Sequence, residues 1–310
     1  MPKIERVVLK FTGGASLTEL LSGNVDAIQV SDSAQLRAIA NDPRFQIYWT
    51  LANGGSNAFM VILWQNEHPL FREPEVRRAL GLAVNRRELL EVLNVPVELS
   101  LVDEWYTSRQ ARRGERSGPR YDPAEARRLL DQAGWRQRSR DGLRERGGQE
   151  FRFTALVSTQ AAWGASCIGA AVFVQGQLAD LGVRMDLQPL EGGVLRSRIR
   201  AKEFEAAVCS QRVAYIRPEL FFGEQSPTGY RNPQLTKLLD VLRTTADPDA
   251  QDHAHREMSD LLRRDQPITF LLRGVFGQVA HRRVKGLSGP WRADPLMFTE
   301  DLWLDDHVKD

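Results

Sequence analysis

The chain has 310 residues, of which 42% are hydrophobic and 26% charged, a globular composition with material for about two domains. This composition excludes a disordered, collagen-like or coiled-coil chain. The longest apolar runs, Ala58–Trp64 and Ile268–Leu272, are too short to cross a bilayer. Met1–Gly14 carries four charged residues and lacks the apolar segment of a signal peptide, so we expect no signal peptide in this chain.

Charge is nearly balanced, with 42 basic and 40 acidic residues and a net charge of +2. The segment 109–146 is the exception, because it holds twelve arginines against six acidic residues. Nucleic-acid binding would need interleaved aromatic residues, a helix-turn-helix or an OB pattern, and the sequence has none of these. We therefore expect solvated surface in this segment and no nucleic-acid partner.

The expected elements begin as an alternation of strands and helices, which is typical of an α/β unit. In chain order they are a strand over Val7–Phe11, a short helix over Leu17–Leu21 that Gly23 ends, a strand over Val25–Val30, a helix from Asp32 or Ser33 to Ile39, and strands over Phe45–Trp49 and Ala58–Trp64. Helical spacing of apolar residues then predicts helices over Glu75–Val84 and Arg86–Leu93, and 94–120 is predicted as a long surface loop.

The rest of the chain repeats this alternation. A helix starts at Asp122-Pro123 and ends at Gly134, and Asp141-Gly142 and Gly147-Gly148 mark a small hairpin. The further expected elements are strands over Phe151–Val157, Val183–Leu187, Glu205–Ser210, Ile268–Leu272, Gln278–His281 and Met297–Leu304, and helices over Ala161–Leu181, Gly193–Ala201, Pro233–Arg243 and Asp249–Arg264.

Residues that carry chemistry are sparse. Cys167 and Cys209 are too few for a disulfide framework or a four-ligand metal site; one bridge is possible, but their apolar context favours buried thiols. His253 and His255 lie two apart on an expected helix, so they cannot share a metal. No HExxH, Gly-x-Ser-x-Gly or P-loop motif occurs. We predict a protein without metal or cofactor that binds a ligand between α/β lobes and is not an enzyme.

Five collinear stretches together carry a family resemblance. They are Leu20–Ala27, Pro69–Arg86, Tyr121–Trp135, Val174–Val183 and Tyr230–Ile268, and they include Ser-Gly-Asn-Val-Asp-Ala, Tyr-Asp-Pro-Ala-Glu-Ala-Arg and Tyr-Arg-Asn-Pro. In order and spacing they resemble the peptide-type (family 5) solute-binding proteins of bacterial ABC importers. Most of these residues also have plain structural uses, since Gly23 and Gly134 suit helix ends and Pro123 a helix start.

The resemblance implies an α/β, type II periplasmic-binding-protein-like architecture, in which two lobes close like a hinge on a ligand. On this chain, residues 1–58 and 284–310 would form part of the first lobe and residues 59–283 the second lobe. The chain would cross between the lobes near 57–64 and 274–283. Full-length relatives carry a long segment before the counterpart of Val7, so we expect the N-terminal part of the first lobe to be absent from this chain.

The resemblance also implies a role and partners. The role is the substrate-binding component of an ABC importer in the periplasm or another extracytoplasmic space, capturing a peptide-like or other small organic solute. The partners would be the membrane permease and, if the gene is split, a separate chain that supplies the missing part of the lobe. The alternative is a ligand-sensing or split-gene remnant of the same fold with a regulatory or interaction role.

Candidate ligand contacts follow the predicted strand that ends near Ser210. In dipeptide-binding relatives, the loop before a Pro-acid-x-Phe-Phe segment carries an acid that holds the ligand ammonium. Here that loop has Gln211, Arg212, Tyr215 and Arg217, and the acid is lacking. Arginine would repel an ammonium and would pair with a carboxylate or phosphate. The alternative is that both arginines face solvent or internal acids.

Aromatic residues give the second set of candidates. Trp64 ends the predicted crossing strand, and Trp105 and Tyr106 lie in the long loop. Their rings could form walls against which a ligand stacks. The alternative is packing in a core, which is expected for Trp135 and Trp303.

Overall fold

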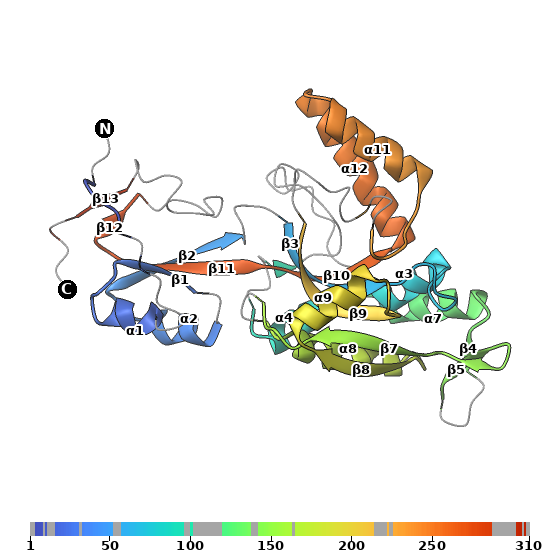
Figure 1. Ribbon diagram of the computed structural model, residues 1–310. Helices are drawn as coiled ribbons and strands as arrows, with labels where there is room; N and C mark the ends of the chain where they lie inside the picture. Colours follow the sequence, from blue (N-terminus) through green and yellow to red (C-terminus); the bar gives the residue numbers. More distant parts are fainter. Residues whose placement is uncertain are drawn as a thin grey trace.

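The computed structural model describes residues 4–8, 10, 16–30, 33–51, 57–95, 100–101, 120–137, 142–162, 165–213, 222, 226–286, 302–305 and 307. The described elements form two groups joined by a narrow connection, with both termini near the smaller group (Figure 1). No helix in these ranges has the length and apolar character needed to span a membrane.

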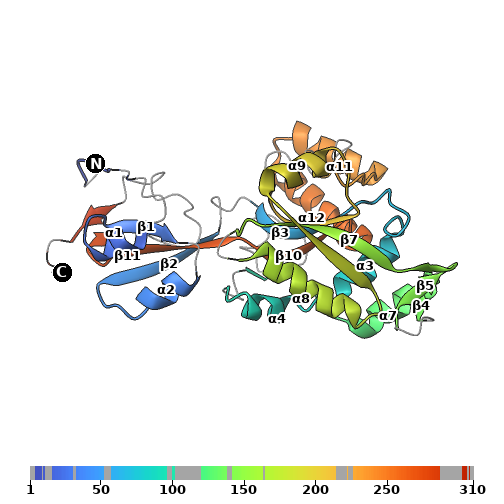
Figure 2. The ribbon, with the colours of Figure 1, turned by 60° about the horizontal axis from the view of Figure 1, so that its bottom comes forward.

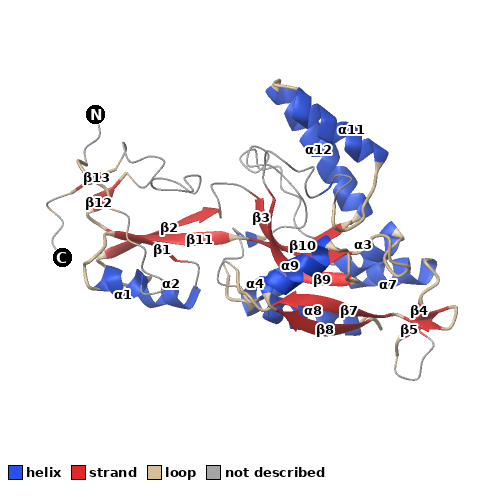
Figure 3. Ribbon diagram, viewed as in Figure 1, coloured by secondary structure: helices blue, strands red, loops and turns tan. Residues whose placement is uncertain are grey.

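The smaller group is a three-stranded antiparallel sheet with two helices on one face. Its order is β1 (Ala27–Val30), β11 (Val275–His281) and β2 (Phe45–Leu51), so the central strand comes from the far end of the sequence. The helices α1 (Ser16–Leu21) and α2 (Ser33–Ile39) lie against it, as Figure 3 shows. Their shared core consists of Leu20, Val30, Leu36, Ile39, Phe45 and Val279. Residues 4–8 form no strand, which differs from the expectation for Val7–Phe11.

Two crossings connect this sheet to a larger one. After β2 the chain continues as β3 (Asn57–Trp64), and it returns through β10 (Ile268–Arg273), Gly274 and β11. β3 and β10 are neighbours in the larger sheet, whereas β11 pairs with β1 and β2. The return crossing therefore begins at Gly274, at the first residue of the expected 274–283 segment.

The larger sheet has five strands in the order β10-β3-β9-β7-β8, with β7 at Arg152–Ser158, β8 at Arg184–Leu190 and β9 at Ala206–Val213. β7 runs parallel to both β8 and β9, and β3 is antiparallel to β9 and β10. The helices α8 (Cys167–Ala179) and α9 (Gly192–Arg200) make the crossover connections that parallel strands require.

Helices cover both faces of this sheet (Figure 2). α3 (Pro74–Leu82), α4 (Arg86–Val92), α7 (Pro123–Gln132) and α8 lie on one face, and α9, α11 (Pro233–Thr244) and α12 (Pro248–Asp265) on the other. Met60, Ile62 and Trp64 of β3 enter the first core, and the alternate residues Phe59, Val61 and Leu63 enter the second. Because both faces of β3 are buried, the segment reads in sequence as one continuous apolar run.

Polar caps set the helix starts. The side chains of Asn85, Asp122, Ser166, Glu191, Asn232 and Asp247 each accept a hydrogen bond from a main-chain N–H in the first turn. Ser166 explains one wrong expectation: the helix predicted from Ala161 starts at Cys167, because Ser166 caps it by accepting from the N–H of Gly169.

A small sheet and a strand pair complete the described elements. β4 (Arg136–Gln137), β5 (Arg144–Arg146) and β6 (Gln149–Glu150) form the small sheet, in which the Gly147-Gly148 turn has φ values of 60° and 82°. These positive φ values explain why the predicted hairpin uses two glycines. β12 (Val284–Lys285) pairs with β13 (Trp303–Leu304), and the remainder of the strand expected over Met297–Leu304 lies mostly outside the described residues.

Neither cysteine forms a disulfide, and both are buried, as the apolar context predicted. Cys167 belongs to the core on the α8 face of the larger sheet, and Cys209 points into the core on the opposite face. Burial raises the pKa of Cys167 to about 11 and that of Cys209 to about 12. Both thiols are therefore protonated at neutral pH and unreactive in the folded chain.

Candidate functional site

One end of the larger sheet collects the features expected of a binding site. β7, β8 and β9 all end there, β3 begins there, and β10 leaves it through Arg273 towards the smaller sheet. We call this end, formed by Ser158, Leu190, Gln211, Phe59 and Arg273, the hinge edge, and the opposite end the distal end. In α/β sheets, ligands bind outside the carboxyl ends of the strands, which here lie at the hinge edge.

The residues after β7 and β8 shape this edge through short-range hydrogen bonds. Ser158 Oγ accepts from the N–H of Gln160 at 3.2 Å, and Glu191 Oε2 accepts from the N–H of Gly193 at 2.7 Å. A Cβ on Gly192 would lie 2.3 Å from Gln160 Oε1, so glycine is needed for the Gln160 side chain to lie over the start of α9. Because α8 and α9 both begin near this edge, the positive ends of two helix dipoles lie there.

Two predicted ligand residues lie at the hinge edge. Gln211 is half-buried, and its Nε2 donates to Cys209 Sγ at 3.2 Å. Arg212 follows it in β9, with its backbone opposite Ala58 of β3. Sulfur is a weak acceptor, so the Gln211 amide can exchange this bond for one to a solute at low cost.

Trp64 is not at this edge, because it is the last residue of β3 and lies at the distal end. Its ring is fully buried, packs against Phe71 and Phe153 with centroid separations of 4.9 Å and 5.9 Å, and donates from Nε1 to Thr269 Oγ1 at 2.9 Å. No surface of the indole is open to a ligand. The expected aromatic wall at Trp64 is therefore wrong, and Trp64 is a core residue.

Four further predicted contacts, Trp105, Tyr106, Tyr215 and Arg217, lie outside the described residues. Sequence reasoning in turn missed Phe59, Glu191 and Arg273 at the hinge edge. Arg273 could have been noticed, because it interrupts an apolar strand immediately before a glycine. Phe59 and Glu191 carry no comparable signal, since one reads as core and the other as a helix cap.

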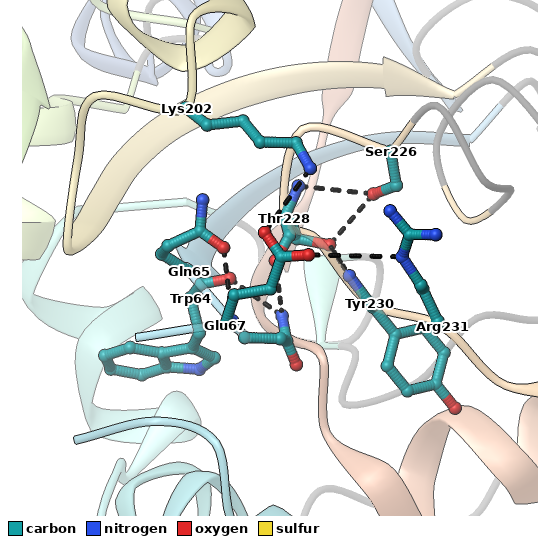
Figure 4. Close-up of polar contacts among 9 residues, drawn as sticks. Trp64, Gln65, Glu67, Lys202, Ser226, Thr228, Tyr230 and Arg231 are labelled. Carbon is teal, nitrogen blue, oxygen red and sulfur yellow. Dashed lines mark hydrogen bonds and ion pairs between the residues drawn. The ribbon is translucent and has the colours of Figure 1, made fainter. Parts of the chain in front are cut away.

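The distal end holds a network that joins several of the sequence motifs (Figure 4). The Glu67 carboxylate lies between Lys202 Nζ at 3.5 Å and Arg231 Nε at 4.0 Å. The N–H of Asn66 donates to the carbonyl of Thr228 at 2.7 Å, and Asn66 Nδ2 donates to the carbonyl of Trp64 at 2.8 Å. These bonds tie the end of β3 to the loop before α11.

Asp265 anchors the same end from α12. It accepts from Tyr230 Oη at 2.6 Å and from Asn232 Nδ2 at 2.9 Å. Burial on its own raises the pKa of Asp265, but hydrogen bonds from Tyr230, Arg264 and Asn232 outweigh it, so the pKa lies below its usual value. The family-like motif around Tyr230 thus serves the scaffold. Within the described ranges, no three His, Cys, Asp or Glu side chains gather as a metal site.

Comparison with known proteins matches this architecture. The family described as "Bacterial extracellular solute-binding proteins, family 5 Middle" matches residues 1–231. The peptide transport periplasmic protein SapA of Salmonella typhimurium is 22% identical over 299 residues, covering 92% of this chain and 51% of the relative. The chain spans about half the length of the curated relatives it matches.

Solved structures share the fold at low sequence identity. The oligopeptide-binding protein AppA of Bacillus subtilis, in complex with a nonapeptide, aligns with a TM-score of 0.68 at 20% identity over 94% of this chain and 58% of that chain. NikZ of Campylobacter jejuni, in complex with Ni(L-His), aligns with a TM-score of 0.71 at 17% identity over 93% and 59%. The type II periplasmic-binding-protein-like fold is confirmed, and the matched family consists of binding proteins rather than enzymes. The chain therefore belongs to the bacterial extracellular solute-binding proteins of family 5.

Proposed function

We propose that the chain is the solute-binding component of an ABC importer and captures a peptide-like or other small organic solute between two lobes. The observation that carries the proposal is the pair of crossings, β2 to β3 and β10 to β11, beside the hinge edge of the larger sheet. Two sheets joined by two strand crossings can rotate about them, and ligands in such proteins bind between the joined bodies.

The lobes of this proposal follow the sheets. The first lobe contains β1, β2 and β11 with the terminal segments 1–58 and 284–310, and the second is built on the five-stranded sheet from residue 59 to the return crossing that begins at Gly274. Gln211 and Arg212 contribute from the hinge edge, and Tyr215, Arg217, Trp105 and Tyr106 remain proposed contacts. The names of the relatives support a solute such as a peptide or a small chelate.

Membership in the family supports two further parts of the proposal. The protein works in the periplasm or an equivalent extracytoplasmic space, and its macromolecular partner is the membrane permease of the importer. Delivery by a diffusible binding protein requires both, because the solute must be handed to a membrane channel on the outer side of the cytoplasmic membrane.

A thermal-shift screen tests solute capture. The purified chain is scanned against di- to nonapeptides, amino-acid chelates, sugars and organic acids. A solute at a hundred times its dissociation constant is expected to add about 2.7 kcal/mol to the free energy of unfolding. Absence of stabilisation by every compound class contradicts the proposal.

A second candidate is a ligand-sensing or split-gene form of the fold with a regulatory or interaction role, in which a separate chain completes the first lobe. It is favoured by the three-stranded sheet, whose outer strands β1 and β2 each have one strand neighbour among the described residues. An open strand edge is a template for pairing with another segment. The DNA upstream of Met1 separates the two candidates, since an encoded first-lobe segment supports a split gene and an encoded helix-turn-helix supports a regulator.

A further inference from the structure

Four arginines are buried among the described residues, namely Arg77, Arg86, Arg144 and Arg273, each at most 3% exposed. Three of them have clear scaffold roles, because their guanidinium groups donate to main-chain carbonyls. Arg77 donates to the carbonyls of Asp265 and Gln266, Arg86 to that of Phe270, and Arg144 to that of Leu181. These bonds join helices and strands within the second lobe.

Arg273 differs in its position. It is the last residue of β10, next to Gly274, so it lies where the chain leaves the larger sheet for the smaller one. Its guanidinium carbon lies 5.4 Å from the centroid of the Phe59 ring, and Phe59 is its register partner in β3. Stacking on an aromatic ring limits the rotation of a guanidinium and leaves its edge available for hydrogen bonds.

Gln211 lies on the other side of the same phenylalanine. Phe59 pairs with Arg273 of β10 on one side and with Gln211 of β9 on the other. Directly paired residues in a sheet share a face, so the three side chains form one row across the hinge edge. Neighbouring strands lie about 4.8 Å apart, so the guanidinium and the amide flank the ring roughly 10 Å apart at the backbone.

This row has the chemistry of an oxyanion site. A guanidinium presents paired N–H donors that match a carboxylate, and its attraction for an anion is strengthened where water is excluded. The Gln211 amide adds a neutral donor whose present acceptor is the weak Cys209 sulfur. The beginnings of α8 and α9 contribute positive dipole ends to the same edge.

We propose that Arg273, together with Gln211, binds the carboxylate of the solute at the hinge edge and makes this chain selective for carboxylate-bearing solutes. The inference rests on the proposed function and adds to it the substrate class and an anchoring residue. A bound carboxylate at Arg273 also contacts the crossing strand itself, so binding and lobe closure act on the same residues.

The test compares matched acids and amides. The probes are a pool of tripeptides with free C-termini, the same pool as C-terminal carboxamides, and a pool of C2–C6 mono- and dicarboxylic acids. Apparent dissociation constants come from thermal-shift titrations of the wild-type chain, Arg273→Gln, Arg273→Lys and the control Arg184→Gln. Arg184 is an exposed arginine at the distal start of β8.

The wild-type chain and Arg184→Gln are expected to bind a free-acid pool at least tenfold more tightly than the carboxamide pool. Arg273→Gln is expected to lose that preference, and Arg273→Lys to keep part of it. Tighter binding of free-acid tripeptides identifies a peptide C-terminus as the source of the carboxylate, and tighter binding of the third pool identifies a free organic acid.

Two results overturn the inference while leaving solute binding intact: equal affinity of the wild-type chain for acids and amides, or a preference that survives in Arg273→Gln. Equal weakening of acids and amides in Arg273→Gln assigns Arg273 a merely structural role and also overturns it. If Arg273→Gln does not fold, the wild-type comparison and Arg273→Lys decide. Binding of no pool at all contradicts the proposed function itself.

Discussion

The two ends of the larger sheet use polar side chains in opposite ways. At the distal end, hydrogen bonds join residues far apart in the chain, such as Asn66 to Pro267 and Tyr230 to Asp265. At the hinge edge, the side chains of Ser158, Glu191 and Gln211 bond to partners only two residues away. Long-range bonds define a tertiary structure, whereas local bonds leave a surface that can exchange its partners for a ligand. The comparison therefore separates scaffold from site.

The largest expected effect is the loss of the distal anchor. Asp265→Ala leaves Tyr230, Asn232 and Arg264 without their acceptor, and removing one partner of a buried charged network costs about 4 kcal/mol. Urea unfolding followed by circular dichroism measures this cost. The exposed control Asp240→Ala, whose carboxylate pairs with Arg243, is expected to change stability by less than about 0.5 kcal/mol. Similar effects of the two variants would remove the distinction between the distal network and ordinary surface pairs.

The next effect is an acid weakness in α12, the helix that carries Asp265. Burial lowers the pKa of His255 from its ordinary value of 6.5 to about 4. Between these values the unfolded chain binds a proton that the folded chain does not, so the free energy of unfolding falls as the pH drops from 6.5 to 4. The loss amounts to at most about 3 kcal/mol.

His255→Gln should flatten this part of the stability profile, measured by urea titrations at pH 4 to 7. His253 is the matched control, because it lies two residues away on the same helix with an exposed side chain. His253→Gln should keep the full pH dependence. A profile unchanged by His255→Gln would assign the acid sensitivity to other groups.

Trp64 tests which end of the sheet binds solute. Trp64→Phe removes the hydrogen bond to Thr269 and part of a buried ring, which is expected to cost about 2 kcal/mol of stability. Once a solute is found, its affinity at a temperature where the variant is folded should be unchanged. A tenfold loss of affinity with little loss of stability would return Trp64 to the site.

Gln211 should show the smallest stability effect. Gln211→Ala removes a half-buried amide and a weak bond to sulfur, so the melting temperature should stay within about one degree, corresponding to less than about 0.5 kcal/mol. Solute affinity is expected to fall at least threefold in isothermal titration. A variant that melts much lower but binds normally would place Gln211 with the scaffold.

Much of the fold could be predicted from the sequence because its signals are local. Asp122 and Pro123 mark a helix start, Gly147-Gly148 a tight turn, and the run Ala58–Trp64 a strand buried on both faces. The start of α8 was placed too early because the apolar residues before Ser166 extend the helical pattern, whereas a capping hydroxyl ends it. Such a cap competes with pattern and wins through one hydrogen bond.

The candidate site was harder to predict, because its residues come from three strands that register brings together. Gln211 was found through a family-like loop, and Trp64 was misassigned because a tryptophan at a strand end looks the same in sequence whether it faces solvent or a core. Arg273 and Phe59 lie more than two hundred residues apart, and only the pairing of β10 with β3 makes them neighbours.

The sequence by itself determined the α/β class, most helix and strand positions, the absence of a disulfide framework and the family, because periodicity, capping residues and collinear motifs act within short stretches of chain. Tertiary structure decided which end of the sheet is scaffold and which is open to a solute. Strand order and register determine which distant side chains share a face, and that choice is made by packing of the whole core rather than by any local segment.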